Sequence, residues 1–226
     1  MDLILQLVDF IIHIDVHLEA IITDYGTWTY IILFGIVFAE TGFVVTPFLP
    51  GDSLIFAAAA FAARGWLNPW LIFLTMAGAG IIGDAVNYSI GHYIGPRVFT
   101  EDVRFLKREY LDKAHDFFEE HGGKAVILAR FMPIVRTFVP FVAGAGAMTY
   151  SKFVLYNVVG AISWVGLFTT LGYFFGNIPA VEENFTIVIF AIIFLSLLPP
   201  IFEAYKERKK SKQVLVEEPD VQTEEI

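Results

Sequence analysis

Apolar positions along the chain form long runs separated by short polar breaks, a pattern typical of helices that lie in a membrane. Residues 69 to 95 and 153 to 176 are almost entirely apolar. Each run reaches the length of about 20 residues that a helix needs to cross a bilayer. A third apolar run, 185 to 202, precedes the basic sequence KERKKSK. We therefore predict an all-α integral membrane protein with spanning helices in these three ranges.

Two further apolar runs contain residues that break helices. Residues 30 to 63 are interrupted by TGFVVTPFLPGD, and residues 125 to 148 contain two prolines. Proline ends or kinks a helix because it lacks a backbone N–H. Each run is therefore predicted to form a re-entrant hairpin, in which two half-helices enter the membrane and return on the same side. The hairpin tips are expected at Pro47, Pro50, Gly51, Pro133 and Pro140.

The order of hairpin and spanning helix occurs twice, and both spanning helices end in a Gly-x-x-x-Gly sequence, at Gly91 and at Gly172. Six Lys and Arg residues in 97 to 124 and five in 206 to 212 place both segments in the cytoplasm by the positive-inside rule. The first hairpin must then enter from outside and the second from the cytoplasm. The units are predicted to be inverted repeats with tips that meet near the midplane, as in many secondary transporters. Exposed Gly-x-x-x-Gly faces let membrane helices pack closely, so a homodimer is also possible.

The predicted membrane domain comprises residues 25 to 205. Two segments outside it and one within it are more polar than its apolar runs. In residues 1 to 24 apolar side chains recur at helical spacing among acids and histidines, with no Lys or Arg before them. We predict an N-terminal interfacial helix there, not a signal peptide. Residues 97 to 124 predict an amphipathic helix outside the bilayer. Residues 206 to 226, first basic and then acidic, predict a disordered cytoplasmic tail.

Composition excludes several classes of protein. The chain is 56% hydrophobic and 17% charged, with a mean hydropathy of +0.63, far more apolar than a soluble domain. Its net charge of -9 does not indicate a basic partner, because residues 214 to 226 hold five acids and no base. The lack of cysteine excludes disulfides and thiolate chemistry. No basic stripe favours nucleic acid, and His92, His115 and His121 are too scattered for a metal site. We expect no cofactor.

Four charged residues lie within the broken apolar runs: Glu40, Asp52, Arg130 and Arg136. A charge at membrane depth costs about 2.5–3.5 kcal/mol on insertion scales and usually marks a transport pathway. Two kinds of role stay open for these residues, one structural and one in transport. Asp52 stands where an acid can cap a helix, and the arginines can form ion pairs with the acids that only hold the hairpins together. Two guanidiniums at a helix break also suit a phosphate, and carboxylates beside them can exchange protons.

Asp84 is a third acid within a predicted span, one helical turn before Asn87. It is either a proton-relay residue or a hydrogen-bond partner of the neighbouring unit. The nearby Gly78-x-Gly80-x-x-Gly83 matches a dinucleotide fingerprint, but it lacks the βαβ context and instead favours close helix packing. Ser53 and Ser151 have no base beside them in the sequence, so we expect a transporter with no catalytic residues.

The segments that carry these residues resemble a known family. FAETGFVVTPFLPGDSLIF, GDAVNYSIGHYIG and ARFMPIVRTFVPFVAGAGAM are similar to the DedA family of bacterial inner-membrane proteins, related to eukaryotic VTT-domain scramblases, and the resemblance covers residues 1 to about 205. It implies lipid transport linked to the proton-motive force, with two acids and two arginines needed for function, here Glu40, Asp52, Arg130 and Arg136. Asp84 matches only some branches. Members are associated with undecaprenyl phosphate or phosphatidylethanolamine.

The leading hypothesis is proton-coupled translocation of undecaprenyl phosphate, with Arg130 and Arg136 binding the phosphate and Glu40, Asp52 and Asp84 exchanging protons or contacting the headgroup. A phosphatidylethanolamine flippase or scramblase is the second, with the acids on the ammonium group. A proton-coupled exporter of small cations or drugs is the third. The expected partners are a membrane lipid and protons.

Overall fold

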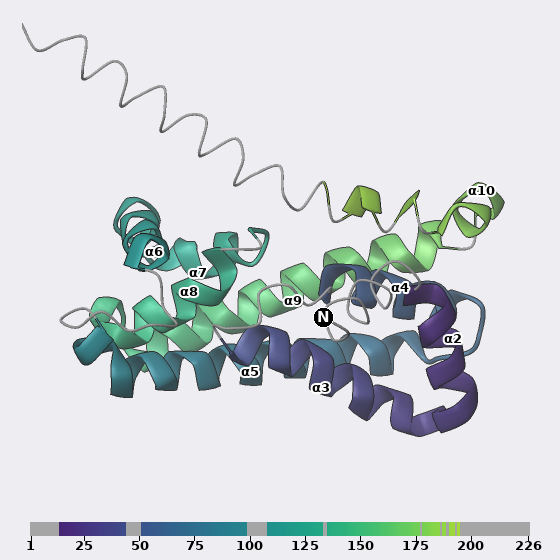
Figure 1. Cartoon of the computed structure of the whole chain (residues 1–226), viewed down its shortest axis with the longest axis horizontal. Coiled ribbons are helices and arrows are strands. Elements are labelled where there is room, and N and C mark those ends of the chain that lie inside the picture. The colour runs from purple at the N-terminus through teal and green to yellow at the C-terminus, as the bar shows by residue number, and fades with distance from the viewer. Residues whose placement is uncertain are drawn as a thin grey trace, which may run out of the picture.

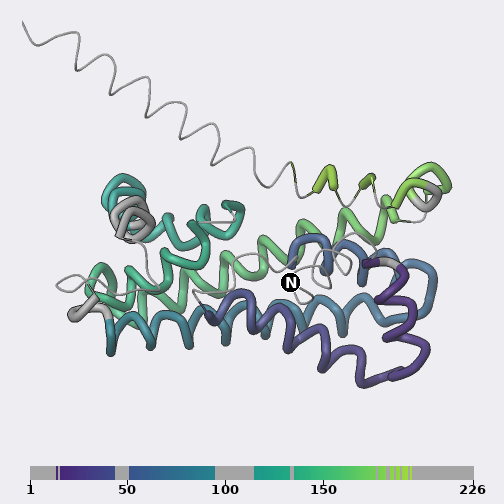
Figure 2. The backbone as a smooth tube through the Cα atoms, in the orientation of Figure 1, coloured from purple at the N-terminus to yellow at the C-terminus, as the bar shows by residue number. Residues whose placement is uncertain are grey.

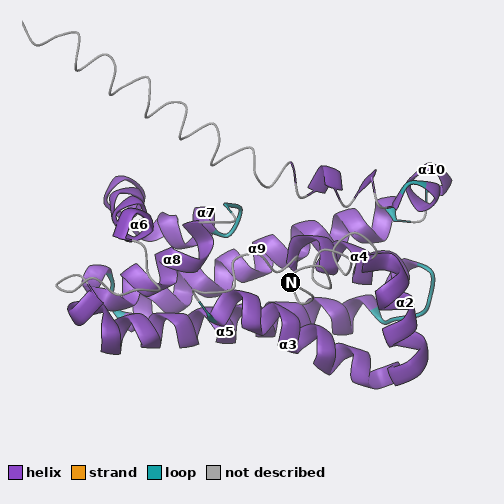
Figure 3. Cartoon of the chain, viewed as in Figure 1, coloured by secondary structure: helices purple, strands orange, loops and turns teal. Residues whose placement is uncertain are grey.

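The computed structural model describes residues 14–43, 51–98, 108–132, 135–176, 178–185, 187–188, 190–192 and 194. Within these ranges every regular element is helical (Figure 3). The helices are α2 (Ile14–Tyr25), η1 (Gly26–Trp28), α3 (Thr29–Gly42), α4 (Gly51–Ala63), α5 (Pro69–Val98), α6 (Arg108–His121), η2 (Gly122–Lys124), α7 (Ala125–Ala129), α8 (Val135–Val142), the π-helix η3 (Ala143–Ala147), α9 (Tyr150–Phe175) and α10 (Pro179–Glu183).

Two long helices, α5 and α9, run along the molecule and pack against each other (Figure 1). Helices α2, α3 and α4 gather at one end, and α6, α7 and α8 gather at the other, as the tube in Figure 2 also shows. Helix α3 packs on α5 and α4 packs on α9, whereas α8 and η3 pack on α5. The long helices therefore connect two groups of short ones.

Among the described residues, three stretches are long and apolar enough to cross a membrane: Val16–Gly42, Pro69–Ile94 and Tyr150–Phe175. The last two confirm the spans predicted at 69–95 and 153–176. The first consists of α2, η1 and α3, and the chain changes direction at η1 (Figure 1). The predicted span at 185–202 lies mostly outside the described residues. The predicted tail at 206–226 lies entirely outside them, as do Pro47, Pro50 and Pro133.

The first broken run forms two separate helices, α3 and α4, as its sequence predicts. The second forms α7 and α8, with a turn from Arg130 to Met132 after α7. The expectation that Pro140 lies at a hairpin tip is wrong. Pro140 is buried inside α8, and the described turns lie on either side of that helix, at Arg130 to Met132 before it and at Gly146, which has a φ of 136° within the following π-helix. A single missing N–H is tolerated where neighbouring helices hold the segment in place.

The loop from α4 to α5 shows why those two helices stop and start where they do. Gly65, with a φ of 81°, follows α4. The N–H of Trp66 donates to the Phe61 carbonyl and that of Gly65 to the Ala62 carbonyl, a Schellman motif. The Phe61 and Trp66 rings lie 5.6 Å apart and complete it. Asn68 then caps α5, because its Oδ1 accepts from the N–H of Trp70 at 2.9 Å and of Leu71 at 3.2 Å.

The polar segment after α5 contains α6, which confirms a helix within 97–124, although residues 97 and 98 still belong to α5. Phe117 and Phe118 are buried, whereas Asp116, Glu119 and Glu120 are exposed. This division is that of an amphipathic helix. At the other end, α2 buries one side through Ile14, Leu18 and Ile22. Its predicted place at the membrane interface stays a prediction.

The glycines that end the two long helices pack inside the chain, not on an exposed face. A Cβ on Gly91 of α5 would overlap the backbone of Phe141 in α8, and one on Gly172 of α9 would overlap the backbone of Phe56 in α4. The expectation that these faces are exposed is wrong, because each long helix uses its glycine to bring a short helix close. A homodimer, which stays a prediction, would need another surface.

Candidate functional site

Arg136 lies at the beginning of α8 and binds two carboxylates from the other half of the molecule. Its Nη2 forms an ion pair with Glu40 Oε1 near the end of α3. Its Nη1 donates a hydrogen bond of 3.0 Å to Asp52 Oδ1 in the first turn of α4. Glu40 Oε1 also accepts from the Gly51 N–H at 3.2 Å. One guanidinium thus joins α3, α4 and α8.

Gly51 has no room for a side chain, since a Cβ there would overlap the Glu40 carboxylate. This contact gives a physical reason for glycine at the predicted hairpin tip. Asp52 follows directly, and its Oδ1 accepts from both Arg136 and the Trp164 indole. The Asp52 side chain therefore takes part in the charge cluster from a position in the first helical turn, where the helix dipole also favours an acid.

Arg130 makes a separate set of contacts directly after α7. Its Nη2 lies 2.5 Å from Asp84 Oδ2 on α5 and 2.5 Å from Asn157 Oδ1 on α9. It also donates to the Gly80 carbonyl at 3.2 Å. A Cβ on Gly160 would lie 3.0 Å from Arg130 Cδ, so glycine lets the arginine reach between the long helices. Asp84 thus bonds to the neighbouring unit, one of the two roles that its position in the sequence allows.

Trp164 on α9 lies beside both arginines. Its Nε1 donates to Asp52 Oδ1 at 2.8 Å. Its ring centre lies 5.2 Å from Cζ of Arg136 and 5.7 Å from Cζ of Arg130, within the range of cation–π attraction. Trp164 is 1% exposed, so the indole closes one side of the cluster and joins the two ion-pair sets.

Asn87, one turn after Asp84 on α5, fixes the backbone around the cluster. Its Nδ2 donates to the Thr41 carbonyl of α3 at 3.2 Å and to the Thr137 carbonyl of α8 at 2.7 Å. Both carbonyls belong to residues next to a member of the cluster, Glu40 and Arg136 respectively. The amide therefore holds the acid-bearing helix and the arginine-bearing helix at a fixed separation.

The cluster is buried and carries an unequal number of charges. Glu40 is 2% exposed, Asp84 4%, Arg130 5% and Arg136 8%, and the Asp52 side chain is 15% exposed. Three carboxylates and two guanidiniums give a net charge of -1 when all are ionised. An unbalanced charge is costly in a buried site. One bound proton would bring the cluster to neutrality.

A small cavity borders the cluster, with a volume of about 10 Å³. Its lining residues are Thr41, Asp84, Arg130, Arg136 and Trp164. This volume is about that of one water molecule. Several buried polar atoms nearby have no hydrogen-bond partner among the described residues, including Glu40 Oε2, Arg130 Nε and Arg136 Nε. The site therefore has unused donors and an unused acceptor, but it is closed to anything larger than water.

The structure brings Glu40, Asp52 and Arg136 together, and it places Arg130 beside them through Trp164. Their roles in transport stay predictions. Asn157 and Trp164 were missed by the sequence analysis. Residues 157, 160 and 164 lie on one face of α9, and a polar amide in the middle of an apolar span was the signal that could have pointed to that face.

The helices of spanning length and the buried ion pairs define a helical integral membrane protein with a polar centre. A family model for the VTT domain matches residues 49–174. The chain is 54% identical over 212 residues to protein DedA of Escherichia coli strain K12, which covers 92% of this chain and 97% of that one. The chain belongs to the DedA family.

Two more distant relatives agree with this assignment. An uncharacterized membrane protein of Mycobacterium leprae is 42% identical over 171 residues, 75% of this chain and 77% of its own length. The inner membrane protein YqjA of E. coli strain K12 is 34% identical over 151 residues, 66% of this chain and 69% of its own length. No solved structure matches the chain.

Proposed function

We propose that this protein transports a lipid, undecaprenyl phosphate, across the cytoplasmic membrane in exchange for or together with protons. The observation that carries the proposal is the pair of buried arginines, Arg130 and Arg136, held by carboxylates between the two groups of short helices. A guanidinium offers planar, forked N–H donors that suit phosphate oxygens. If a phosphate replaces a carboxylate beside the guanidinium, the N–H groups donate the same kind of hydrogen bond to its oxygens.

The charge of the cluster supports coupling to protons. A phosphate monoester brings about -1.5 to -2 charges at neutral pH, and the cluster without it already has one excess acid. Binding a headgroup next to three carboxylates would therefore be unfavourable unless some of them bind protons. Glu40 and Asp52 release Arg136 when they become neutral, because the ion pairs weaken. Proton uptake and phosphate binding are thus favourable together.

The size of the central cavity supports alternating access. A space of about 10 Å³ holds no phosphate group, and the acids occupy the arginines, which supports a transport cycle in which a closed cluster opens. Transport requires α3 and α4 to separate from α8 far enough for a headgroup to enter. The ion pairs of Arg136 are the bonds that break in this step, since they join those helices.

The packing of the short helices is compatible with two inverted repeats of re-entrant hairpin and spanning helix. Helices α3 and α4 have 14 and 13 residues, about 21 and 20 Å at 1.5 Å per residue, shorter than a bilayer core of about 30 Å. Gly91 of α5 receives α8, and Gly172 of α9 receives α4. The second short helix of each unit thus packs on the long helix of the other.

We place the protein in the bacterial inner membrane with α6, Lys152 and the C-terminus in the cytoplasm. The six Lys and Arg residues of 97–124 support this orientation. The description of the relative YqjA as an inner membrane protein supports the location. In this orientation the arginine-bearing helices α7 and α8 approach the centre from the cytoplasmic side.

The test is transport by the purified chain in vesicles that contain labelled undecaprenyl phosphate or labelled phosphatidylethanolamine, with and without a pH gradient. Wild-type protein should move undecaprenyl phosphate faster when the gradient is present. Arg130→Ala and Arg136→Ala should each abolish transport, and Lys124→Ala, which removes an exposed charge, should not. Full transport by both arginine variants would reject the proposal.

A phosphatidylethanolamine flippase or scramblase is the second candidate, and the excess carboxylate favours it. A cluster with a net charge of -1 can receive an ammonium group without further protons. In that case labelled phosphatidylethanolamine should move in the same vesicles, and Glu40→Gln should impair it more than Arg130→Ala does. For a proton-coupled exporter of small cations or drugs, neither lipid would move and neither would copurify.

A further inference from the structure

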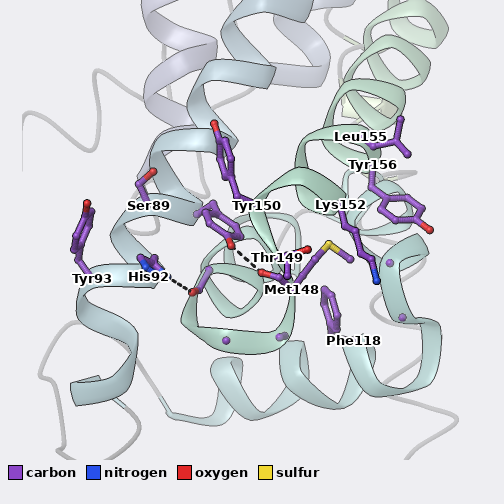
Figure 4. A pocket seen from close by; sticks show the side chains of 16 residues that line it. Ser89, His92, Tyr93, Phe118, Met148, Thr149, Tyr150, Lys152, Leu155 and Tyr156 are labelled. Carbon is purple, nitrogen blue, oxygen red and sulfur yellow. Dashed lines mark hydrogen bonds between the residues drawn. The ribbon is translucent and has the colours of Figure 1, made fainter.

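A second pocket lies at the end of the molecule that carries α6, away from the buried charge cluster. Its volume is about 1240 Å³, and sixteen residues from α5, α6, η2, η3 and α9 line it (Figure 4). None of these residues belongs to the cluster of Glu40, Asp52, Asp84, Arg130 and Arg136. The pocket is therefore a separate site, more than large enough for a lipid headgroup.

The polar groups of this pocket are suited to an anion. Among the described residues that line it, Lys152 is the one charged side chain and none is an acid. His92 lies on the opposite wall (Figure 4), where its Nδ1 is 3.3 Å from the Gly144 carbonyl. If Nδ1 donates this hydrogen bond, Nε2 is left for a ligand. In a chain of net charge -9, a large pocket whose described lining holds a cation and no carboxylate favours a negatively charged ligand.

Further hydrogen-bond donors surround these two side chains. Thr149 and the exposed Tyr93 and Tyr150 supply hydroxyl groups, whereas the Ser89 hydroxyl already donates to the Ala85 carbonyl at 2.8 Å. Helix α9 begins in this wall, because Thr149 is its N-cap residue and no side chain caps it. Its first N–H groups add positive potential to that already supplied by Lys152. Tyr88 does not contribute, since its hydroxyl donates to the Met148 carbonyl at 2.7 Å.

The apolar edge of the pocket indicates that the anion belongs to a lipid. Leu155 lines the pocket and is 63% exposed. Val159 and Ile162 continue from it on the same face of α9 and are also exposed. Lys152, Leu155, Val159 and Ile162 are spaced by three, four and three residues, so they form one stripe along the helix. A ligand with its phosphate at Lys152 can lay its chain along that stripe.

We propose that this pocket binds the phosphate of an anionic lipid, with Lys152 and His92 at the headgroup and the apolar stripe of α9 at the acyl or prenyl chain. The proposal rests on the proposed function in one respect: the pocket would then be the place where the lipid waits before it reaches Arg130 and Arg136. Binding at the pocket needs neither arginine, so the two sites can be tested independently.

The first experiment measures lipid binding to the full chain in detergent, by native mass spectrometry. The probes are phosphatidic acid, phosphatidylcholine and inorganic phosphate. Phosphatidic acid should bind, and Lys152→Gln should weaken it about tenfold, as expected for the loss of one charge-assisted contact. Lys124→Gln, an exposed lysine outside the pocket, is the matched control and should bind normally. Inorganic phosphate should not compete, because it has no chain for the stripe.

The second experiment locates the bound lipid. The chain has no cysteine, so a single introduced thiol reports on one position. Ser89→Cys lies in the pocket, whereas Ser151→Cys lies beside Lys152 on an exposed part of α9 that does not line it. Phosphatidic acid should slow labelling of Ser89→Cys by a maleimide and leave Ser151→Cys unchanged. Equal protection of both thiols would contradict a site within the pocket.

The outcomes separate this inference from the proposed function. Normal binding of phosphatidic acid by Lys152→Gln, or full competition by inorganic phosphate, would overturn the lipid site while leaving the arginine result untouched. Arg136→Ala should keep both phosphatidic acid binding and the protection of Ser89→Cys. If that variant instead loses both, the pocket is not independent and the inference fails. Full transport by the arginine variants rejects the proposed function alone.

Discussion

The two polar regions of this protein both contain cations, but they satisfy them differently. In the central cluster Arg136 pairs with two carboxylates and Arg130 with one, and the adjoining cavity has a volume of about 10 Å³. In the pocket beside α6, Lys152 and His92 face a space of about 1240 Å³ with no acid among the described residues that line it. The cations of the cluster thus have partners within the protein, whereas the pocket has room for a ligand from outside.

The largest effect on stability is expected where a cation of the central cluster is removed. Arg136→Ala leaves Glu40 and Asp52 buried together without their cation, and breaking a buried pair in this way costs about 3–5 kcal/mol of stability. Thermal unfolding in detergent should show a folded protein with a much lower Tm. Adding Glu40→Gln to Arg136→Ala should recover part of the loss. An unchanged Tm in the single variant would mean that the acids are satisfied without Arg136.

The next effect concerns the contact between α5 and α8 that lies between the two regions. A Cβ on Gly91 would overlap the Phe141 backbone, so Gly91→Ala must push α8 away and should cost about 1–3 kcal/mol. Gly35→Ala in α3 is the matched control, since nothing lies within 4 Å of a Cβ there. That change should raise the Tm slightly, because alanine has a higher helix propensity than glycine. Equal effects of the two substitutions would show that α5 and α8 are not in close contact.

Trp164→Phe tests the link between the two ion-pair sets. It removes the 2.8 Å hydrogen bond to Asp52 and keeps an aromatic ring near the arginines. We expect a loss of about 1–2 kcal/mol, typical of a buried hydrogen bond to a charged group. The free energies of unfolding of Trp164→Phe, of Asp52→Asn and of the double variant together give the coupling energy between the two residues. Strict additivity would indicate that the indole does not act through Asp52.

The smallest effect on stability is expected in the open pocket. Lys152 is exposed, and Lys152→Gln should change stability by less than about 0.5 kcal/mol, as is usual for surface substitutions. A drop of the size expected for Arg136→Ala would instead show that Lys152 has a buried partner. The two regions would then not differ, because the cations of both would have buried partners within the protein.

Much of the fold follows from the sequence, because membrane spans and proline breaks are local signals. The spans at 69–95 and 153–176 and the separation of α3 from α4 were predicted from apolar runs and from Pro and Gly. Pro140 misled the prediction, since neighbouring helices hold α8 together around it. A proline in a sequence does not reveal whether tertiary contacts will accommodate it.

The partners within the site were harder to predict than its members. The sequence marks Arg130 and Asp84 as unusual charges, but they are 46 residues apart, and their contact depends on the rotation of α5 about its axis. Asn157 and Trp164 belong to the site for the same reason. The pocket was not predicted at all, because its residues are ordinary in their own helices and become a site only where α5, η3 and α9 meet.

The exchange of partners between the two halves has a consequence for the synthesis of the protein. Asp52 precedes Arg136 by 84 residues, which at about 5–20 residues per second takes roughly 4–17 seconds of translation. During that time the first group of helices enters the membrane with its acids and without the cation that will bind them. Neither half completes its ion pairs alone, so we expect the first half to be less stable until the second arrives. A chain that ends after α5 should accordingly be a substrate for quality-control proteases.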